Sequence, residues 1–164
     1  MGGAEPSRAY ATWIQQLATD GRRAIDYAET RPELDVGRLA YSGISWGARL
    51  GPLMIALEPR IKTGIFILGG LGSGAAALPE ADPFNFAPRV RVPILMLNGD
   101  QDFIFPVQIS QQPLLQALGT PAADKQHVLY PGGHDVVGTH RSQMIQQIVA
   151  WLDRCLGQVQ SLLR

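Results

Sequence analysis

The pentapeptide Gly43-Ile44-Ser45-Trp46-Gly47 has residue types and a spacing that could perform acyl-transfer chemistry. It follows an apolar run and precedes a helical pattern, the setting in which G-x-S-x-G forms the nucleophile elbow of a serine hydrolase. Glycines two residues to either side of the serine allow the close backbone approach that so sharp a turn requires. The hydroxyl would then stand at a helix N-terminus, where backbone N–H groups point outward. The alternative is a tight glycine turn that contains an incidental serine.

A carboxylate and an imidazole follow this serine, each just after an apolar run. Asp100 and Asp102 come after residues 93–97, and His134 lies in the glycine-rich segment after residues 125–130. A carboxylate at the carboxyl end of a strand can fix the tautomer of an imidazole, which can then act as general base for the serine. The alternatives are a polar turn and a solvated loop histidine. The order Ser, Asp, His favours the α/β-hydrolase layout and leaves both aspartates open.

Three other side chains with chemical potential have less favourable positions. His127 falls in the middle of a predicted strand and His140 at the start of the last predicted helix, so we expect structural or surface roles. Cys155, the only cysteine, lies on the apolar face of that helix, which favours a buried thiol over a reactive one. No spacing typical of metal ligands is present, and we expect neither a metal nor a cofactor.

Helical patterns alternate with short apolar runs along the chain. The predicted helices span residues 8–30, 46–57, 107–118 and 139–156, and the predicted strands span residues 38–45, 61–68, 93–97 and 125–130. Pro113 must kink or restart the third helix. Because the apolar runs are nearly continuous, we expect a mostly parallel sheet covered on both faces, in an α/β three-layer sandwich of about four strands. Residues 1–164 would form a single domain.

Composition excludes several classes of partner. Fourteen basic and fourteen acidic residues give zero net charge, so no basic surface favours nucleic acid or an anionic membrane. No apolar run approaches the about 18 residues of a membrane-spanning helix. The N-terminal segment has no basic or apolar region typical of a secretory signal, and a cytoplasmic location is the expectation.

On these motifs the chain resembles the α/β-hydrolase family, most closely its dienelactone-hydrolase-like and prolyl-oligopeptidase-like branch. The resemblance covers about residues 8–157. The G-x-x-D-x-x-x-P pattern of that branch falls on residues 99–106 and selects Asp102 as the catalytic acid. The resemblance implies Ser45 as nucleophile, His134 as base and the Trp46 N–H in the oxyanion hole. The implied activity is a carboxylesterase that forms an acyl-enzyme on small or short-chain acyl esters.

Aromatic residues near these motifs are candidates for an apolar substrate pocket. Those put forward are Phe103, Phe84 and Phe86, with Trp46 and Phe105 as further possibilities. Core or surface packing would equally account for at least half of them.

The chain departs from the family in that only one predicted helix precedes the elbow strand. It resembles the C-terminal half of the fold, a truncated α/β-hydrolase without the early loop that supplies a second oxyanion-hole N–H. The elbow strand would then be an open, apolar edge. We expect a homodimer in which residues 38–44 pair antiparallel across a two-fold axis, giving a sheet of about eight strands.

Two alternatives to an esterase follow from the same observations. The chain could be a catalytically weak half-domain that serves as a binding module, or a piece of a larger hydrolase. It could also be a serine peptidase, a class that usually needs a further domain to restrict access.

Overall fold

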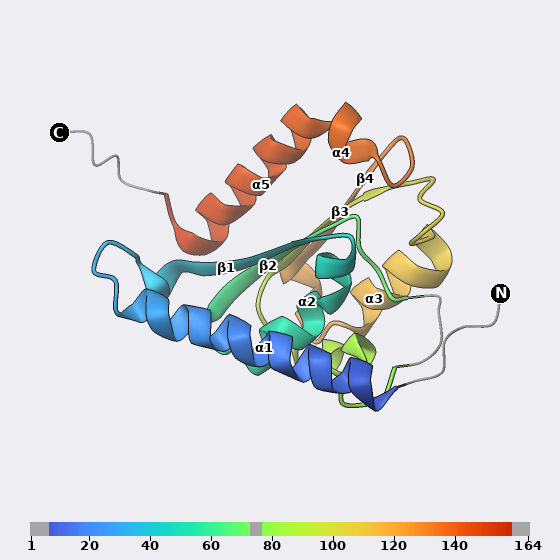
Figure 1. Ribbon diagram of the computed structural model, residues 1–164. Coiled ribbons are helices and arrows are strands. Elements are labelled where there is room, and N and C mark those ends of the chain that lie inside the picture. Colours follow the sequence, from blue (N-terminus) through green and yellow to red (C-terminus); the bar gives the residue numbers. More distant parts are fainter. Residues whose placement is uncertain (1–6, 73–76, 159–164) are drawn as a thin grey trace.

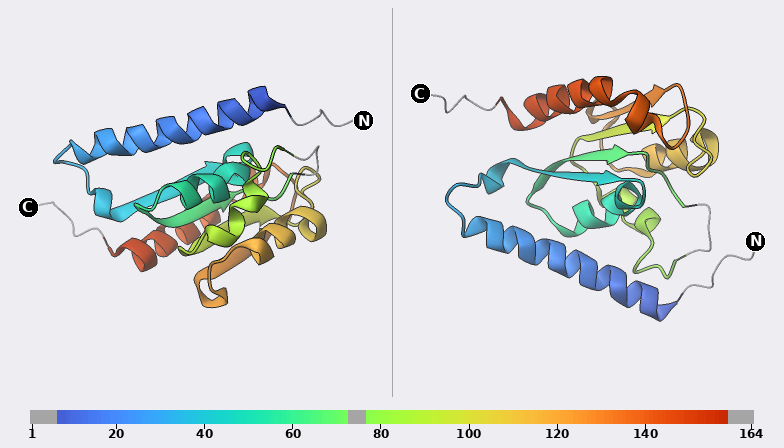
Figure 2. Two further views of the ribbon diagram at one scale, coloured as in Figure 1. Left: turned by 90° about the horizontal axis from the view of Figure 1, so that it is seen from below. Right: turned by 45° about the horizontal axis from the view of Figure 1, so that its top comes forward.

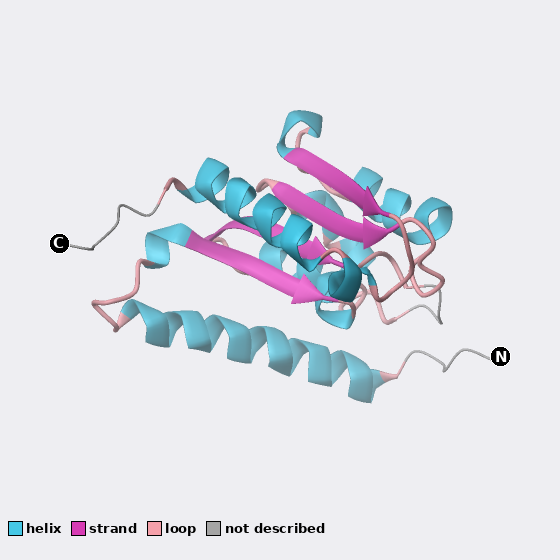
Figure 3. Ribbon diagram, turned by 90° about the horizontal axis from the view of Figure 1, so that it is seen from above, coloured by secondary structure: helices cyan, strands magenta, loops and turns pink. Residues whose placement is uncertain are grey.

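A parallel four-stranded sheet forms the centre of the computed structural model, which describes residues 7–72 and 77–158. The strands are β1 (Leu39–Ile44), β2 (Ile61–Ile67), β3 (Ile94–Gly99) and β4 (Lys125–Tyr130), in the spatial order β1-β2-β3-β4. All neighbouring strands pair in parallel, so their carboxyl ends meet at one edge of the sheet (Figure 3). The predicted α/β class with a parallel sheet is confirmed.

Helices cover both faces of the sheet. They are α1 (Arg8–Glu29), α2 (Trp46–Leu57), α3 (Gln112–Ala117), α4 (Val136–Thr139) and α5 (Arg141–Leu156). Helices α4 and α5 lie on one face, and α2 and α3 on the other (Figure 1). Helix α1 runs along α2 on the side of the sheet away from α5 (Figure 2). None of the helices in the described ranges is long and apolar enough to cross a membrane.

The two faces of the sheet bury separate apolar clusters. Phe66 and Met96 face α2 and α3, whereas Ile65 and Leu97 face α5. Since both faces are covered, residues 65–67 of β2 and 94–97 of β3 are all apolar, in a continuous rather than an alternating pattern. The buried Trp151 of α5 satisfies its indole N–H by donating to the Thr63 hydroxyl, at 2.8 Å.

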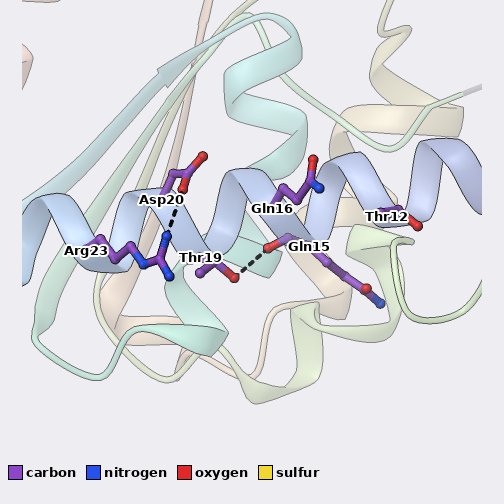
Figure 4. A pocket seen from close by; sticks show the side chains of 6 residues that line it. All are labelled: Thr12, Gln15, Gln16, Thr19, Asp20 and Arg23. Atoms are coloured by element: carbon purple, nitrogen blue, oxygen red, sulfur yellow. Dashed lines mark hydrogen bonds and ion pairs between the residues drawn. The ribbon is translucent and has the colours of Figure 1, made fainter.

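Helix α1 is amphipathic, and only one side of it belongs to the core. Ala11, Ile14 and Ala18 pack in a cluster with Leu50 and Leu53 of α2. The opposite side carries the polar side chains drawn in Figure 4, which are Thr12, Gln15, Gln16, Thr19, Asp20 and Arg23. All of them come from this one helix, so no group from a second element converges on the shallow hollow that they line.

The segment predicted as one helix over residues 107–118 is two elements. Its first turn, Val107–Gln111, is a π-helix, and α3 begins at Gln112. Pro113 lacks an N–H and its ring crowds the carbonyl four residues earlier, which disfavours a regular α-helix through this point. The predicted restart at Pro113 is confirmed, and the wider first turn is an addition that the sequence did not reveal.

The C-terminal end of α1 is joined to the turn between α2 and β2 by Arg60, which is held by the buried carboxylate of Glu58. The Arg60 guanidinium donates to both oxygens of Glu58, at 2.7 and 2.6 Å. Its other terminal nitrogen lies 2.7 Å from Asp26 and 3.0 Å from Glu29 of α1. Hydrogen bonds from Arg60 hold the pKa of the Glu58 carboxyl below its usual range, against the opposing effect of burial.

Substitution Glu58→Gln is expected to lower the melting temperature at neutral pH. Because the pKa of this carboxyl is lower in the folded chain than in the unfolded one, its contribution is complete above the unfolded value of about 4.3. The contribution disappears as pH falls through the folded value, so thermal melts from pH 7 to pH 3 should show the two proteins converging. Glu33→Gln is the control, since Glu33 pairs with Arg31 in solvent, where ion pairs contribute little. A difference in melting temperature that is constant with pH would contradict this account.

Candidate active site

Ser45 occupies the turn between β1 and α2 in a backbone conformation that is unusual for a residue with a side chain. Its φ is 54° and its ψ is −112°. Such positive φ values are strained outside glycine and persist only where the surroundings enforce them. The Ser45 N–H donates to the Ile67 carbonyl at 2.8 Å, and the Ser45 carbonyl accepts from the Arg49 N–H at 3.0 Å. These bonds hold the turn between the sheet and the first turn of α2.

The two glycines of the elbow have different reasons to be there. A Cβ on Gly43 would lie 2.4 Å from the carbonyl carbon of Gly47, so only glycine permits the observed backbone contact. A Cβ on Gly47 would meet nothing within 4 Å. The Gly47 carbonyl accepts a hydrogen bond from the Tyr41 hydroxyl at 2.6 Å. Burial raises the pKa of Tyr41 to about 12, so the phenol keeps the proton that it donates.

The structure brings Ser45, Asp102 and His134 into one hydrogen-bonded chain. His134 Nδ1 lies 2.7 Å from Asp102 Oδ2, and His134 Nε2 lies 2.8 Å from Ser45 Oγ. An ionised carboxylate accepts only, so the Nδ1 proton points to Asp102 and leaves Nε2 free to accept the proton of the serine hydroxyl. The arrangement can therefore remove the Ser45 proton when the hydroxyl attacks an electrophile.

Asp102 is fixed within its own loop. Only 2% of the residue is exposed, and its Oδ1 accepts backbone N–H bonds from Ile104 at 2.8 Å and Phe105 at 3.1 Å. These two donors leave Oδ2 as the oxygen that faces the imidazole. The carboxylate therefore keeps a partner on each oxygen, as a buried charge must.

Asp100, the other sequence candidate, holds the histidine loop rather than the histidine. Its side chain accepts the Gly132 N–H at 3.0 Å, and its own N–H donates to the Tyr130 carbonyl at 2.9 Å. A Cβ on Gly99 would lie 2.3 Å from the Gly133 carbonyl oxygen, so the end of β3 and the loop that carries His134 approach more closely than a side chain would allow. Asp100 thus binds the backbone of the histidine loop, whereas Asp102 binds the imidazole of His134.

The aromatic candidates lie in different environments. Phe103, next to Asp102, is 81% exposed, and Phe84 is exposed in a short 3-10 turn, Pro83–Asn85. Phe86 is only 8% exposed and packs in the cluster between α1 and α2, so its ring cannot contact a substrate without leaving the core. The exposed Trp46 indole stacks on Trp13 of α1, with ring centroids 5.1 Å apart and planes at 20°.

Sequence reasoning missed Trp13 as a neighbour of the elbow. The helical pattern placed Ile14 on the buried side of α1, and nothing in the sequence signalled a contact between Trp13 and a residue 33 positions away. Across residues 7–72 and 77–158, no three His, Cys, Asp or Glu side chains gather as a metal site would require.

The chain is similar in sequence and in structure to known hydrolases. The sequence model of the dienelactone hydrolase family matches residues 7–149. Candidate carboxymethylenebutenolidases from Methylorubrum extorquens and Escherichia coli K12 are 29% identical over 120 residues and 34% identical over 101 residues. These matches cover 73% and 61% of this chain but 41% and 37% of the relatives, so the chain spans less than half of their length. The native structure of a cold-adapted esterase from an Arctic intertidal metagenomic library is 28% identical with a TM-score of 0.69, covering 84% of this chain and 57% of that one.

Substitution Gly43→Ala is expected to destabilise the fold by about 1–3 kcal/mol, because the added methyl forces the elbow backbone apart. It should also slow the reaction of Ser45 with a fluorophosphonate reagent. Gly47→Ala is the matched control, since its methyl enters open space and alanine favours a helix over glycine. Thermal melts and labelling rates would measure both effects, and equal behaviour of the two variants would contradict the proposed close contact.

Proposed function

The chain belongs to the dienelactone hydrolase family, and we propose that it hydrolyses carboxylic esters with Ser45, His134 and Asp102 as its catalytic triad. The observation that carries this proposal is the unbroken chain of hydrogen bonds from Asp102 through His134 to Ser45, at 2.7 and 2.8 Å. The strained backbone of Ser45 also supports a catalytic role for this residue, because strain in folded proteins concentrates at functional sites.

The proposed mechanism is covalent. Ser45 Oγ attacks the acyl carbonyl while His134 Nε2 accepts its proton, which gives a tetrahedral intermediate. The Trp46 N–H, at the start of α2, donates to the oxyanion. Collapse of the intermediate breaks the ester bond, and His134 gives its proton to the leaving alcohol. Water, deprotonated by the same histidine, then attacks the acyl-enzyme and releases the acid and free Ser45, while Asp102 orients and stabilises the imidazolium throughout.

We propose small or short-chain acyl esters as the substrate class. The relatives named as carboxymethylenebutenolidases and esterases support an ester substrate. Trp46 follows Ser45 in the sequence and Phe103 follows Asp102. Both side chains are exposed and could contact an apolar acyl or alcohol group. Phe86 is not included, because its ring is buried in the core.

Substitution Ser45→Ala is expected to reduce hydrolysis of p-nitrophenyl acetate and butyrate by about 10⁴–10⁶-fold in kcat, because the attacking oxygen is lost. It should also abolish labelling by a fluorophosphonate. Ser142→Ala, which changes an exposed serine of α5, is the control and should leave both readouts unchanged.

Other results would favour other functions. Turnover that survives Ser45→Ala would exclude Ser45 as the nucleophile. A wild-type protein that is folded but inert to esters and fluorophosphonate would favour a binding module. Hydrolysis of peptide anilides without hydrolysis of esters would favour a peptidase.

We also propose that two copies of the chain pair through β1. Among the described strands β1 contacts only β2, and α1 extends beyond its free side (Figure 3). Ile44 on β1 is 55% exposed, and an apolar groove of about 240 Å³ runs between α1 and β1. A second β1 strand laid antiparallel would cover this groove and double the sheet.

Light scattering is expected to give a mass of twice the 17.8 kDa chain. Ala40→Lys on β1 should shift the protein to the monomer, because a two-fold axis brings the introduced charges together at the edge. Thr19→Lys, on the polar side of α1, is the control and should remain dimeric. A monodisperse wild-type monomer would refute the pairing and would favour completion of the sheet by a different polypeptide.

A further inference from the structure

A buried glutamine lies beneath the loop that carries Asp102. Gln111 ends the π turn Val107–Gln111, and none of its surface is exposed. Its Nε2 donates to the Gly99 carbonyl at 3.0 Å and to the Phe105 carbonyl at 2.7 Å. These two residues bound the segment 99–105, called here the acid loop. One side-chain amide therefore joins both ends of the acid loop, with Asp102 between them.

Phe105 connects this amide to the carboxylate. Its carbonyl accepts from Gln111, while its N–H donates to Asp102 Oδ1 at 3.1 Å. The bonds from the Ile104 and Phe105 N–H groups orient the carboxylate within the loop. The two bonds from Gln111 orient the loop against the end of β3. Through these bonds Gln111 is connected to the carboxylate whose Oδ2 faces His134.

His127 completes the hydrogen bonding of Gln111. Because both amide protons face carbonyls, Gln111 Oε1 must accept, and His127 Nε2 lies 3.1 Å from it. His127 is half-buried in β4, and burial lowers its pKa, which favours the neutral ring. Because Gln111 Oε1 can only accept, the ring proton that forms this bond lies on Nε2. Every donor and acceptor of the Gln111 amide then has a partner, so its orientation is unique.

The π turn gives Gln111 its direction. The Gln111 N–H reaches back to the Pro106 carbonyl, and the Gln112 N–H reaches the Val107 carbonyl, both five residues earlier. One extra residue in a turn rotates the following side chains by about 100°, and such turns recur at functional sites. Pro113 removes the N–H that a regular helix would need here.

We infer that Gln111 is a positioning residue, braced by His127, that fixes Asp102 opposite His134. This inference rests on the proposed function for its effect on turnover, but its effect on the Asp102–His134 pair is measurable without turnover.

Substitution Gln111→Met retains the length of the side chain and removes its donors. Because the loss of these donors would displace the acid loop, kcat is expected to fall by about 10²-fold with KM little changed. The low-field proton NMR signal of the His134 Nδ1–H bonded to Asp102 should broaden or disappear. His127→Phe removes only the donor to Gln111 Oε1, and a smaller loss, of about tenfold, is expected with the same spectral change.

Thr120→Val is the matched control. Thr120 is also buried, and its hydroxyl also contacts two carbonyls, those of Val90 at 3.3 Å and Val92 at 2.7 Å. These carbonyls precede β3, whereas the carbonyls bound by Gln111 lie at its end and beyond it. Thr120→Val should lower the melting temperature while leaving kcat and the NMR signal of the folded protein unchanged. If Thr120→Val and Gln111→Met lowered kcat and weakened the NMR signal equally, Gln111 would have only a structural role.

The outcomes separate this inference from the proposed function. If Gln111→Met or His127→Phe keeps both the NMR signal and kcat while Ser45→Ala abolishes turnover, the positioning role is refuted and the esterase stands. If the wild type has no esterase activity but the signal depends on Gln111 and His127 and not on Thr120, the positioning role stands and the proposed function fails.

Discussion

Continuation of the backbone ladder past the ends of the strands is the interaction on which the site depends. The Ser45 N–H bonds to the Ile67 carbonyl, the Leu68 N–H to the Leu97 carbonyl and the Asp100 N–H to the Tyr130 carbonyl. These bonds link all four strands at their carboxyl edge, where the loops begin to diverge. Because parallel strands bring these ends together, residues far apart in sequence lie side by side there in the folded chain.

Close packing of backbone atoms sharpens this arrangement. Gly43 touches the first turn of α2, and Gly99 touches the loop that carries His134, at distances that no side chain would permit. Polar side chains then hold each loop from one side, with Tyr41 bonded to the elbow, Asp100 to the histidine loop and Gln111 to the acid loop. The three side chains of the candidate site thus lie on loops that are each held by separate contacts.

Most of the fold was predictable because its signals are local. Continuous apolar runs predicted parallel strands, and Ser45, Asp102 and His134 each stand directly after such a run, within short motifs. The features that were missed depend on contacts across the fold. Nothing near Phe86 indicates that α1 covers it, and nothing near Trp13 indicates a stack with Trp46. His127 lies within β4 as expected, but its bond to Gln111 depends on a π turn that the sequence did not reveal.

The hydrogen bond between His134 and Ser45 joins residues 89 positions apart. The proposed activation of Ser45 therefore depends on a residue that is synthesised much later. A chain emerging from the ribosome exposes the serine long before its histidine has been made. Such high sequence separation also makes this contact costly to form early in folding. The hydroxyl proposed as the nucleophile therefore has no imidazole partner until β4 has docked and His134 has reached Ser45.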